Sequence, residues 1–150
     1  MSNHKSYIDL ILKGSIQDYK GGDELKRNCA EIIQTLFRYS NQVHIYHWQT
    51  KSYSRHKASD MLLDGLTDFI DKFIEVYMGK YGRPDFKPDT SIILNNMDNT
   101  QATLFLDEMI NFYTNELPKY LDLQKDTDLF NIRDEILAVI NRIKYLFTLE

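Results

Sequence analysis

The stretch DELKRNCAEIIQTLFRYSNQVHIYHWQ, residues 23–49, decides the fold of this protein. Its apolar side chains recur at steps of three and four residues, and this spacing returns them to one face of an α-helix. The stripe consists of Leu25, Cys29, Ile32, Leu36, Tyr39 and Val43. Asp23 is a residue type that commonly caps a helix N-terminus. The stretch therefore predicts a long amphipathic helix over residues 23–49.

Three further helices are predicted along the chain. A second stripe over residues 55–80 consists of Leu62, Leu66, Phe69, Phe73 and Tyr77, and similar patterns follow over 100–122 and 128–147. The short polar link before the second helix forces the first two helices into an antiparallel hairpin. About twenty residues with few helix signals separate the second helix from the third. A connection of that length is typical of a four-helix bundle whose second and third helices run parallel.

Length and composition indicate one helical domain with a leading arm. Residues 1–22 hold a short apolar patch closed by Gly14 and by Gly21-Gly22, and they predict an N-terminal arm with a short helix. Residues 23–150 then form the bundle. The net charge is −4 and the single cysteine excludes an internal disulfide. Because no apolar run reaches the ~20 residues that span a bilayer, we expect a soluble, cytoplasmic protein.

Histidines and carboxylates on the first two long helices form the candidate site. His47 continues the apolar stripe of its helix, so it is expected to point inward. His56 and Asp60 are four residues apart, as are Asp71 and Glu75, and side chains so spaced share one helix face. Imidazole combined with carboxylate suits iron, zinc or manganese. The lack of neighbouring thiolates weighs against a closed structural zinc site.

The two pairs cannot hold one ion within a single chain. Eleven residues separate Asp60 from Asp71, which at ~1.5 Å per residue places the pairs ~16 Å apart. A two-fold axis that crosses this helix near Gly65 would bring Asp71 and Glu75 of one copy beside His56 and Asp60 of the other. The spacing thus predicts a symmetric dimer with two intersubunit sites. The alternative is that the acidic pairs are solvated helix faces and His47 is a structural core histidine.

Residues 47–84 carry a resemblance to a known family. His-Trp at 47–48, H-x-x-x-D at 56–60, D-x-x-x-E at 71–75 and Tyr-Gly-Arg-Pro at 81–84 follow one another in order. This series resembles the signature of the Dps mini-ferritins. The resemblance implies an all-α, ferritin-like four-helix bundle with a long crossover between helices 2 and 3, and a dodecameric shell built from two-fold dimers.

The same resemblance implies a ferroxidase activity. Its centre would take His47, His56 and Asp60 from one subunit and Asp71 and Glu75 from the neighbour. Fe(II) would bind there and be oxidised by hydrogen peroxide or dioxygen. The ferric product would be stored inside the shell, and the cell would be protected against oxidative damage.

Two alternatives accompany this hypothesis. Trp48 would supply an electron beside the centre, or else it packs as an aromatic residue in an interface. DNA binding, the family's other activity, is weakly supported because the chain has no lysine-rich tail. The connection between His47 and His56 is short, and this favours an alternative function. In that alternative the chain is a ferritin-like structural or DNA-associated assembly protein without a working ferroxidase centre.

Overall fold

The computed structural model describes the backbone of residues 3–149 and the side chains of residues 22–149. Within that range the chain forms four α-helices and no strand, so the predicted all-helical class is confirmed: α1 (Asn3–Gln49), α2 (Tyr53–Tyr81), α3 (Asn99–Asn111) and α4 (Thr127–Leu146). A π-helical turn, η1, and a 3₁₀ turn, η2, continue α3 (Phe112–Glu116 and Leu117–Tyr120).

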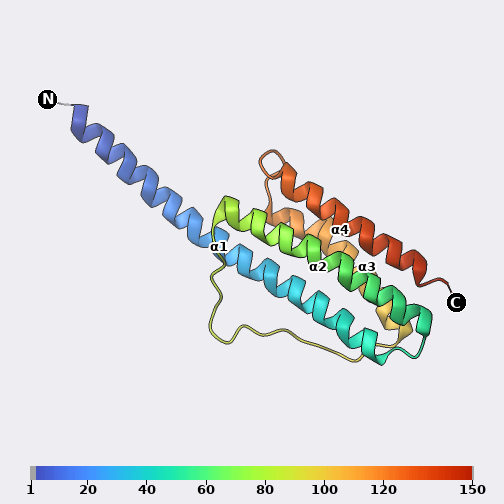
Figure 1. Ribbon diagram of the computed structural model, residues 1–150. Helices are drawn as coiled ribbons and strands as arrows, with labels where there is room; N and C mark the ends of the chain where they lie inside the picture. The colour runs from blue at the N-terminus through green and yellow to red at the C-terminus, as the bar shows by residue number, and fades with distance from the viewer. Residues whose placement is uncertain (1–2, 150) are drawn as a thin grey trace.

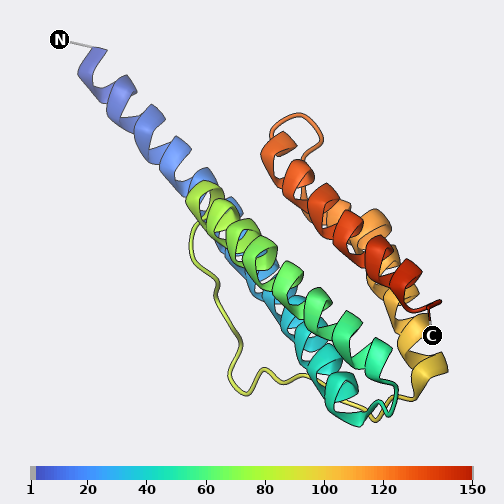
Figure 2. The same ribbon diagram turned by 45° about the vertical axis from the view of Figure 1, so that its right-hand side comes forward.

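The four helices form two antiparallel pairs joined by a long crossover. α1 and α2 make the first pair, and the extended chain after α2 returns along the length of the bundle (Figure 1). α3 therefore runs parallel to α2, and α4 turns back antiparallel to α3 (Figure 2). α4 packs against α2 as well as α3. The parallel second and third helices and the long crossover agree with the prediction.

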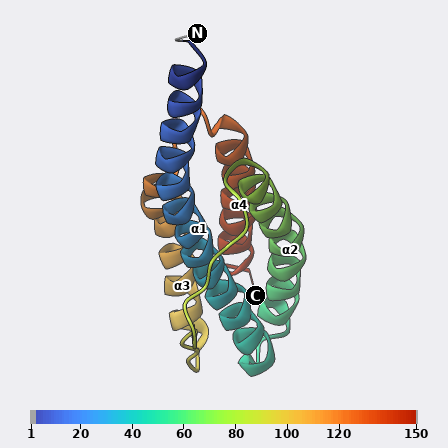
Figure 3. The ribbon, with the colours of Figure 1, turned by 90° about the vertical axis from the view of Figure 1, so that its left-hand side faces the viewer.

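The first helix is longer than predicted. α1 runs without interruption from Asn3, so the break expected at Gly21-Gly22 is wrong. A glycine inside a helix costs only about 1 kcal/mol relative to alanine, which does not by itself end a long helix. The N-terminal part of α1 extends beyond the ends of the other helices (Figures 1 and 3). Residues 1–2 and the side chains of residues 3–21 lie outside the described part, and the division into arm and bundle stays a prediction.

The turn between α1 and α2 is three residues long and is capped. The Ser52 hydroxyl accepts a hydrogen bond from the Arg55 N–H at 3.3 Å, which satisfies one of the free donors at the start of α2. The Thr50 N–H donates to the Tyr46 carbonyl at 2.9 Å and closes the last turn of α1. The last turn of α1 consequently lies beside the first turns of α2, which places His47 next to His56.

α2 ends at a glycine that the backbone requires. Gly82 has a φ of 92°, in the left-handed region that favours glycine, and its N–H donates to the Met78 carbonyl at 2.8 Å. Three residues later the Asp85 N–H donates to the Lys26 carbonyl of α1 at 3.1 Å. The crossover is therefore tied to α1 as soon as it leaves α2.

The bundle interior is almost entirely apolar. Every helix contributes fully buried side chains, among them Leu36, Leu62, Phe73, Leu106, Tyr113, Ile136 and Ile140. α2 and α4 approach closely at Gly65, where an added Cβ atom would lie 2.8 Å from a Val139 methyl carbon. Of the described side chains, the buried polar ones are Gln42, Ser59 and Asp126. No described helix is long and apolar enough to cross a membrane.

Three glutamines of α1 hold the crossover in place. The Gln34 amide donates to the Ser91 carbonyl, and the Gln49 side chain both donates to Asn96 and accepts from the Met97 N–H. Between them, Gln42 donates to the Asn95 carbonyl at 2.6 Å and accepts from the Asn95 N–H at 2.9 Å. Eight residues of helix rise ~12 Å and four extended residues span ~13 Å. This match holds between Gln34 and Gln42, whereas Gln49, seven residues further along α1, meets the crossover only one and two residues beyond Asn95.

We expect Gln42→Leu to destabilise the protein by about 2–3 kcal/mol. Gln42 is 2% exposed, and leucine would leave the N–H and the carbonyl of Asn95 without their partner. An unsatisfied buried polar group costs about 1–3 kcal/mol. Urea unfolding measures the change, and Gln34→Leu, at a more exposed position of the same series, is the control. Equal losses in the two variants would show that burial of Gln42 does not matter.

The predicted helix over 100–122 changes geometry before it ends. The Leu117 N–H donates five residues back, to the Phe112 carbonyl, which is the spacing of a π-turn. Pro118 follows in η2 and has no N–H to continue an α-helical ladder. The last turns of this helix are thus a π-turn followed by a 3₁₀ turn.

Candidate metal site at the end of the first helix pair

Three predicted ligands converge where α1 ends and α2 begins. His47 comes from the last turn of α1, while His56 and Asp60 come from the first two turns of α2. One ligand atom from each lies within 4.8 Å of the other two. All three side chains are partly buried. The sequence spacing placed His56 and Asp60 on one helix face, and the short turn brings His47 to them.

The two imidazole rings are stacked. The ring centroids of His47 and His56 lie 3.8 Å apart, and their planes are inclined by only 19°. The two side chains therefore lie close enough to share an ion. Because the lone pair of each Nε2 lies in its own ring plane, binding of one ion by both rings requires the rings to tilt out of the stack.

Hydrogen bonds determine which nitrogen of each ring carries the proton. His56 Nδ1 lies 2.9 Å from the His47 carbonyl oxygen, which can only accept, so Nδ1 is the protonated nitrogen of a neutral His56. His47 Nδ1 lies 3.1 Å from the His56 carbonyl oxygen and 2.9 Å from the Ser59 hydroxyl oxygen. Ser59 donates its own hydrogen to the His56 carbonyl at 2.8 Å, so it accepts from His47. Each neutral ring consequently presents an unprotonated Nε2.

Asp60 supplies the third ligand and the open side of the site. Its Oδ1 lies 3.3 Å from His47 Nε2, and its side chain is 47% exposed against 12% for His47. The histidines are thus held by the protein while the carboxylate faces solvent. An ion bound here would have protein ligands on one side and free coordination positions on the other.

The donor set is suited to a divalent transition metal. Two imidazole nitrogens and one carboxylate with open positions are the arrangement that non-haem Fe(II) proteins use, and zinc and manganese accept the same donors. Hydrogen bonds from Nδ1 to backbone carbonyls also orient metal-binding histidines in known sites. The residues present therefore fit such an ion in ligand type and in proximity.

Ser59 is a functional residue that sequence reasoning missed. It is 0% exposed and connects His47 to the His56 carbonyl. A serine three residues after a histidine on a helix is too common a pattern to single out. Only the antiparallel turn reveals its role, because its partner His47 belongs to the other helix.

We expect Ser59→Ala to lower metal affinity by about tenfold without unfolding the protein. The variant removes one hydrogen bond to His47 Nδ1 and leaves the weaker contact with the His56 carbonyl. Loss of such orienting partners typically reduces affinity by about 10–100-fold. Titration with Co(II) under anaerobic conditions measures the change. Ser54→Ala, in the first turn of α2 but outside the cluster, should bind like the unmodified protein.

The structure does not bring the other predicted ligands to this cluster. Asp71 and Glu75 are exposed on α2, beyond the group formed by the three converging ligands. Trp48 is 70% exposed, and its ring lies 5.7 Å from the ring of His44. Whether a second copy supplies the two acids, and whether Trp48 supplies an electron, stay predictions.

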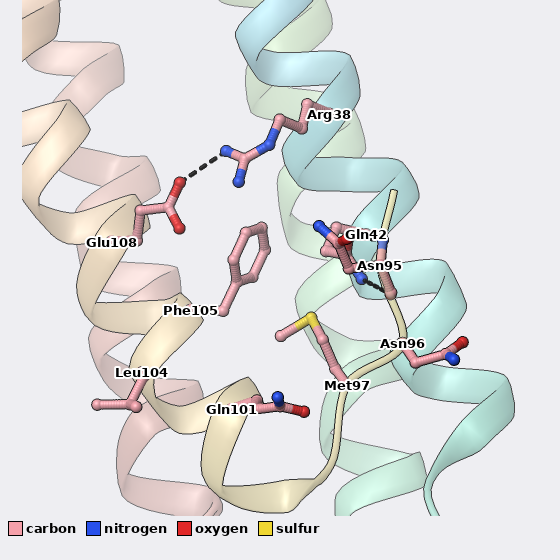
Figure 4. Close-up of a pocket in the computed structure, with 9 residues that line it drawn as sticks. All are labelled: Arg38, Gln42, Asn95, Asn96, Met97, Gln101, Leu104, Phe105 and Glu108. Carbon is pink, nitrogen blue, oxygen red and sulfur yellow. Dashed lines mark hydrogen bonds and ion pairs between the residues drawn. The ribbon is translucent and has the colours of Figure 1, made fainter. Parts of the chain in front are cut away.

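Another candidate site is a hollow of about 510 Å³ between α1, the end of the crossover and α3 (Figure 4). Arg38 and Glu108 face each other across it with a nitrogen–oxygen distance of 2.6 Å. Gln42 is bonded to the crossover backbone, and Gln101 caps α3 through the Asp98 N–H. The charged pair and the two glutamines of this hollow already have partners, so the cluster at the end of α1 is the stronger candidate site.

Comparison with known proteins places the chain in a family. Residues 47–147 match the model of a family of unknown function (DUF5856), and the chain belongs to that family. The chain is also similar to an uncharacterised 14.6 kDa protein encoded in the mobD-ri intergenic region of Enterobacteria phage T4. The two are 33% identical over 123 residues, which cover 80% of this chain and 88% of the phage protein. No solved structure matches.

The family match corrects the resemblance to the Dps mini-ferritins, which is wrong. The matching region includes every residue on which that resemblance rested, yet the family it defines is a different one. His and acidic pairs at four-residue steps arise readily on amphipathic helices, because the same spacing serves any helix face. The short motifs were consistent with the helix hairpin and did not specify the family.

Proposed function

We propose that this protein binds Fe(II) through His47, His56 and Asp60 and promotes its oxidation. The observation that supports the proposal is the convergence of these three side chains, each with a ligand atom within 4.8 Å of the other two, while both imidazole Nδ1 atoms are engaged by the opposite helix. Ligands that already lie near one another lose little conformational freedom when an ion binds. A solvated helix face would not hold two stacked histidines in this way.

Fe(II) is the substrate in this proposal. Imidazole nitrogens retain Fe(II), and a carboxylate favours the higher charge of Fe(III). With hydrogen peroxide as the oxidant, two Fe(II) ions each lose one electron, and the peroxide takes up two electrons and two protons to give two water molecules. The partly exposed side of Asp60 gives peroxide and water access to the site.

The helix connectivity supports a ferritin-like fold class for this chain. Four-helix bundles with one long crossover include the ferritin-like folds, whose metal ions lie among carboxylates in the bundle interior. Here the described interior holds one buried carboxylate, Asp126, far along the chain from the histidines. We therefore propose that metal chemistry takes place at the end of the α1–α2 pair and not in the middle of the bundle.

Completion of the site by a second copy is a further part of the hypothesis. Asp71 and Glu75 of a partner would fill open coordination positions if two α2 helices paired antiparallel. The same pairing would bring Asp64 and Asp68 of the two copies together at the axis, where like charges repel. We therefore assign the three ligands of one chain as the minimal site. Storage inside a shell and protection against oxidants stay predictions.

Anaerobic Fe(II) loading followed by addition of hydrogen peroxide tests the proposal. In the unmodified protein we expect saturable Fe(II) binding and rapid formation of Fe(III). The absorbance of Fe(III) monitors the reaction. Asp60→Asn should slow oxidation at least tenfold, whereas Asp64→Asn, one turn further along α2, should leave it unchanged. If iron oxidation proceeds at the rate of buffer alone, the protein is an assembly protein without a working centre.

A further inference from the structure

A groove of about 470 Å³ follows the outer side of α1 and α2. Its apolar residues are Ile33 and Phe37 from α1 and Ile70 and Ile74 from α2. Phe37 is 56% exposed, which is unusual for a phenylalanine in the middle of a helix. We call this hollow the α1–α2 groove. Its floor would favour an apolar partner.

One edge of the α1–α2 groove is acidic because Asp68 and Asp71 line it, and these two belong to a longer series along α2. Five carboxylates recur along α2 at steps of three and four residues, and at about 100° per residue they fall within an arc of about 80°: Asp60, Asp64, Asp68, Asp71 and Glu75. We call them the acidic stripe. Apart from the contact between Asp60 and His47, no described residue forms an ion pair with the stripe.

The opposite edge of the groove carries no acidic side chain. Ser40, Asn41 and His44 line it on the α1 side. The groove is thus apolar in the middle, acidic along α2 and uncharged along α1 when His44 is neutral. A complementary partner is a helix with an apolar stripe and with lysines or arginines along one border of that stripe.

The first twenty residues of this same chain combine an apolar stripe with three lysines along one border, which also carries Asp9. Lysines occur at positions 5, 13 and 20, and Ile8, Leu12, Ile16 and Tyr19 recur at steps of three and four residues. The lysine positions are separated by eight and seven residues. The same separations relate Asp60, Asp68 and Glu75, so the two charge series have the same length on a helix, ~22 Å.

A segment from a second copy can reach the groove where the chain's own segment cannot. α1 is one continuous helix from Asn3 to Gln49, and its N-terminal part extends away from the bundle (Figures 1 and 3). A straight helix cannot fold back onto the groove that begins eleven residues further on, at Ile33. The groove and the extending segment are therefore separated within one chain and available between two.

We propose that residues 3–22 of a second copy dock in the α1–α2 groove, with Lys13 beside Asp68 and Lys20 beside Glu75. The docked segment would run parallel to α2 and hence antiparallel to α1. Since His47 lies opposite Asp60, the residue of α1 opposite Asp68 is near 39. A two-fold axis near residue 26 then relates the two α1 helices, and each copy both provides a segment and receives one.

Sedimentation equilibrium on full-length protein in a chelator tests this dimer without any contribution from metal. We expect a dimer whose dissociation constant rises at least tenfold in Lys13→Glu/Lys20→Glu and in Asp68→Lys/Glu75→Lys. The variant that combines all four changes should recover the affinity, because its charges are exchanged and not removed. High salt should weaken the unmodified dimer, since exposed ion pairs are screened.

Matched controls separate this surface from general charge effects. Asp134→Lys/Glu135→Lys makes the same change in net charge at exposed positions of α4, outside the groove, and should leave the dimer intact. His47→Ala should also leave it intact, which distinguishes failure of this proposal from failure of the metal site.

Three results would overturn the docking proposal. One is a monomer at every concentration, which includes the case where the segment bends at Gly21-Gly22 onto its own groove. Another is a dimer that tolerates both charge reversals. The third is a dimer that forms only with metal and depends on Asp71 and Glu75, which would indicate pairing of two α2 helices.

Discussion

Replacement of His56 by alanine is expected to lower Fe(II) or Co(II) affinity by a factor on the order of 100 or more. His56 provides one of two nitrogen ligands, and its ring also stacks on His47 at 3.8 Å. Its removal leaves one imidazole and a carboxylate that is half exposed. Replacing a residue that only orients a metal ligand already reduces metal affinity by about 10–100-fold, so loss of a ligand itself should exceed that range.

Anaerobic calorimetry measures this affinity directly, and thermal unfolding provides a second readout. An ion that binds only the folded state stabilises it by about 2.7 kcal/mol at a concentration of one hundred times Kd. We expect Co(II) to raise the Tm of the unmodified protein and to leave that of His56→Ala unchanged.

His44→Ala is the matched control for this prediction. It removes an exposed histidine of α1 that lies one turn from His47 and packs beside Trp48. The control should bind metal normally. Equal binding by His56→Ala and the unmodified protein would remove this residue from the site.

The second large effect is expected at Asp126, in the connection before α4. The carboxylate is 1% exposed and accepts hydrogen bonds from the Tyr81 hydroxyl and, at 2.7 Å, from the Asp122 N–H. The Lys80 ammonium lies 3.0 Å from it. Asp126 thus joins the end of α2 to the start of α4, at the opposite end of α2 from the metal site.

Asp126→Ala should destabilise the protein by roughly 3 kcal/mol. The variant leaves the Tyr81 hydroxyl and the Asp122 N–H without their acceptor, and each such loss costs about 1–3 kcal/mol. Urea unfolding measures the change. Asp128→Ala is the control, because Asp128 also contacts Lys80 but is half exposed. A loss at position 126 no larger than at position 128 would contradict the role of burial.

The same carboxylate predicts how stability depends on pH. Burial alone would raise the pKa of Asp126, but hydrogen bonds from Asp122 and Tyr81 and the Lys80 charge outweigh burial and lower it below 3.8. A folded pKa below the unfolded value adds stability that is present above about pH 4 and is lost as the pH falls through the folded pKa. This acid-dependent component should be absent from Asp126→Ala when unfolding is measured between about pH 2 and 5.

Helix positions were predictable because they depend on local periodicity. The stripes that begin at Leu25 and Leu62 are repeated at each turn, and the turn between their helices is too short for any arrangement except a hairpin. The uninterrupted helix through Gly21-Gly22 was not predictable in this way, since the cost of glycine is small compared with the stability of a long helix.

Part of the candidate site was predictable for the same reason. His56 and Asp60 share a face through their spacing alone, and the apolar stripe before His47 indicates its direction. The exchange of hydrogen bonds between His47 and His56 was not predictable. It depends on how two helices meet, and no pattern within either helix specifies it.

The sequence by itself determined the helical class, the hairpin of the first two helices, the long crossover and the residue types available for a metal. Each follows from interactions between residues a few positions apart. Only the tertiary structure decided that Gln42 holds the crossover, that Ser59 orients His47 and that Asp71 and Glu75 lie away from the cluster. These features join residues on different segments, and their distances are set by the packing of whole helices.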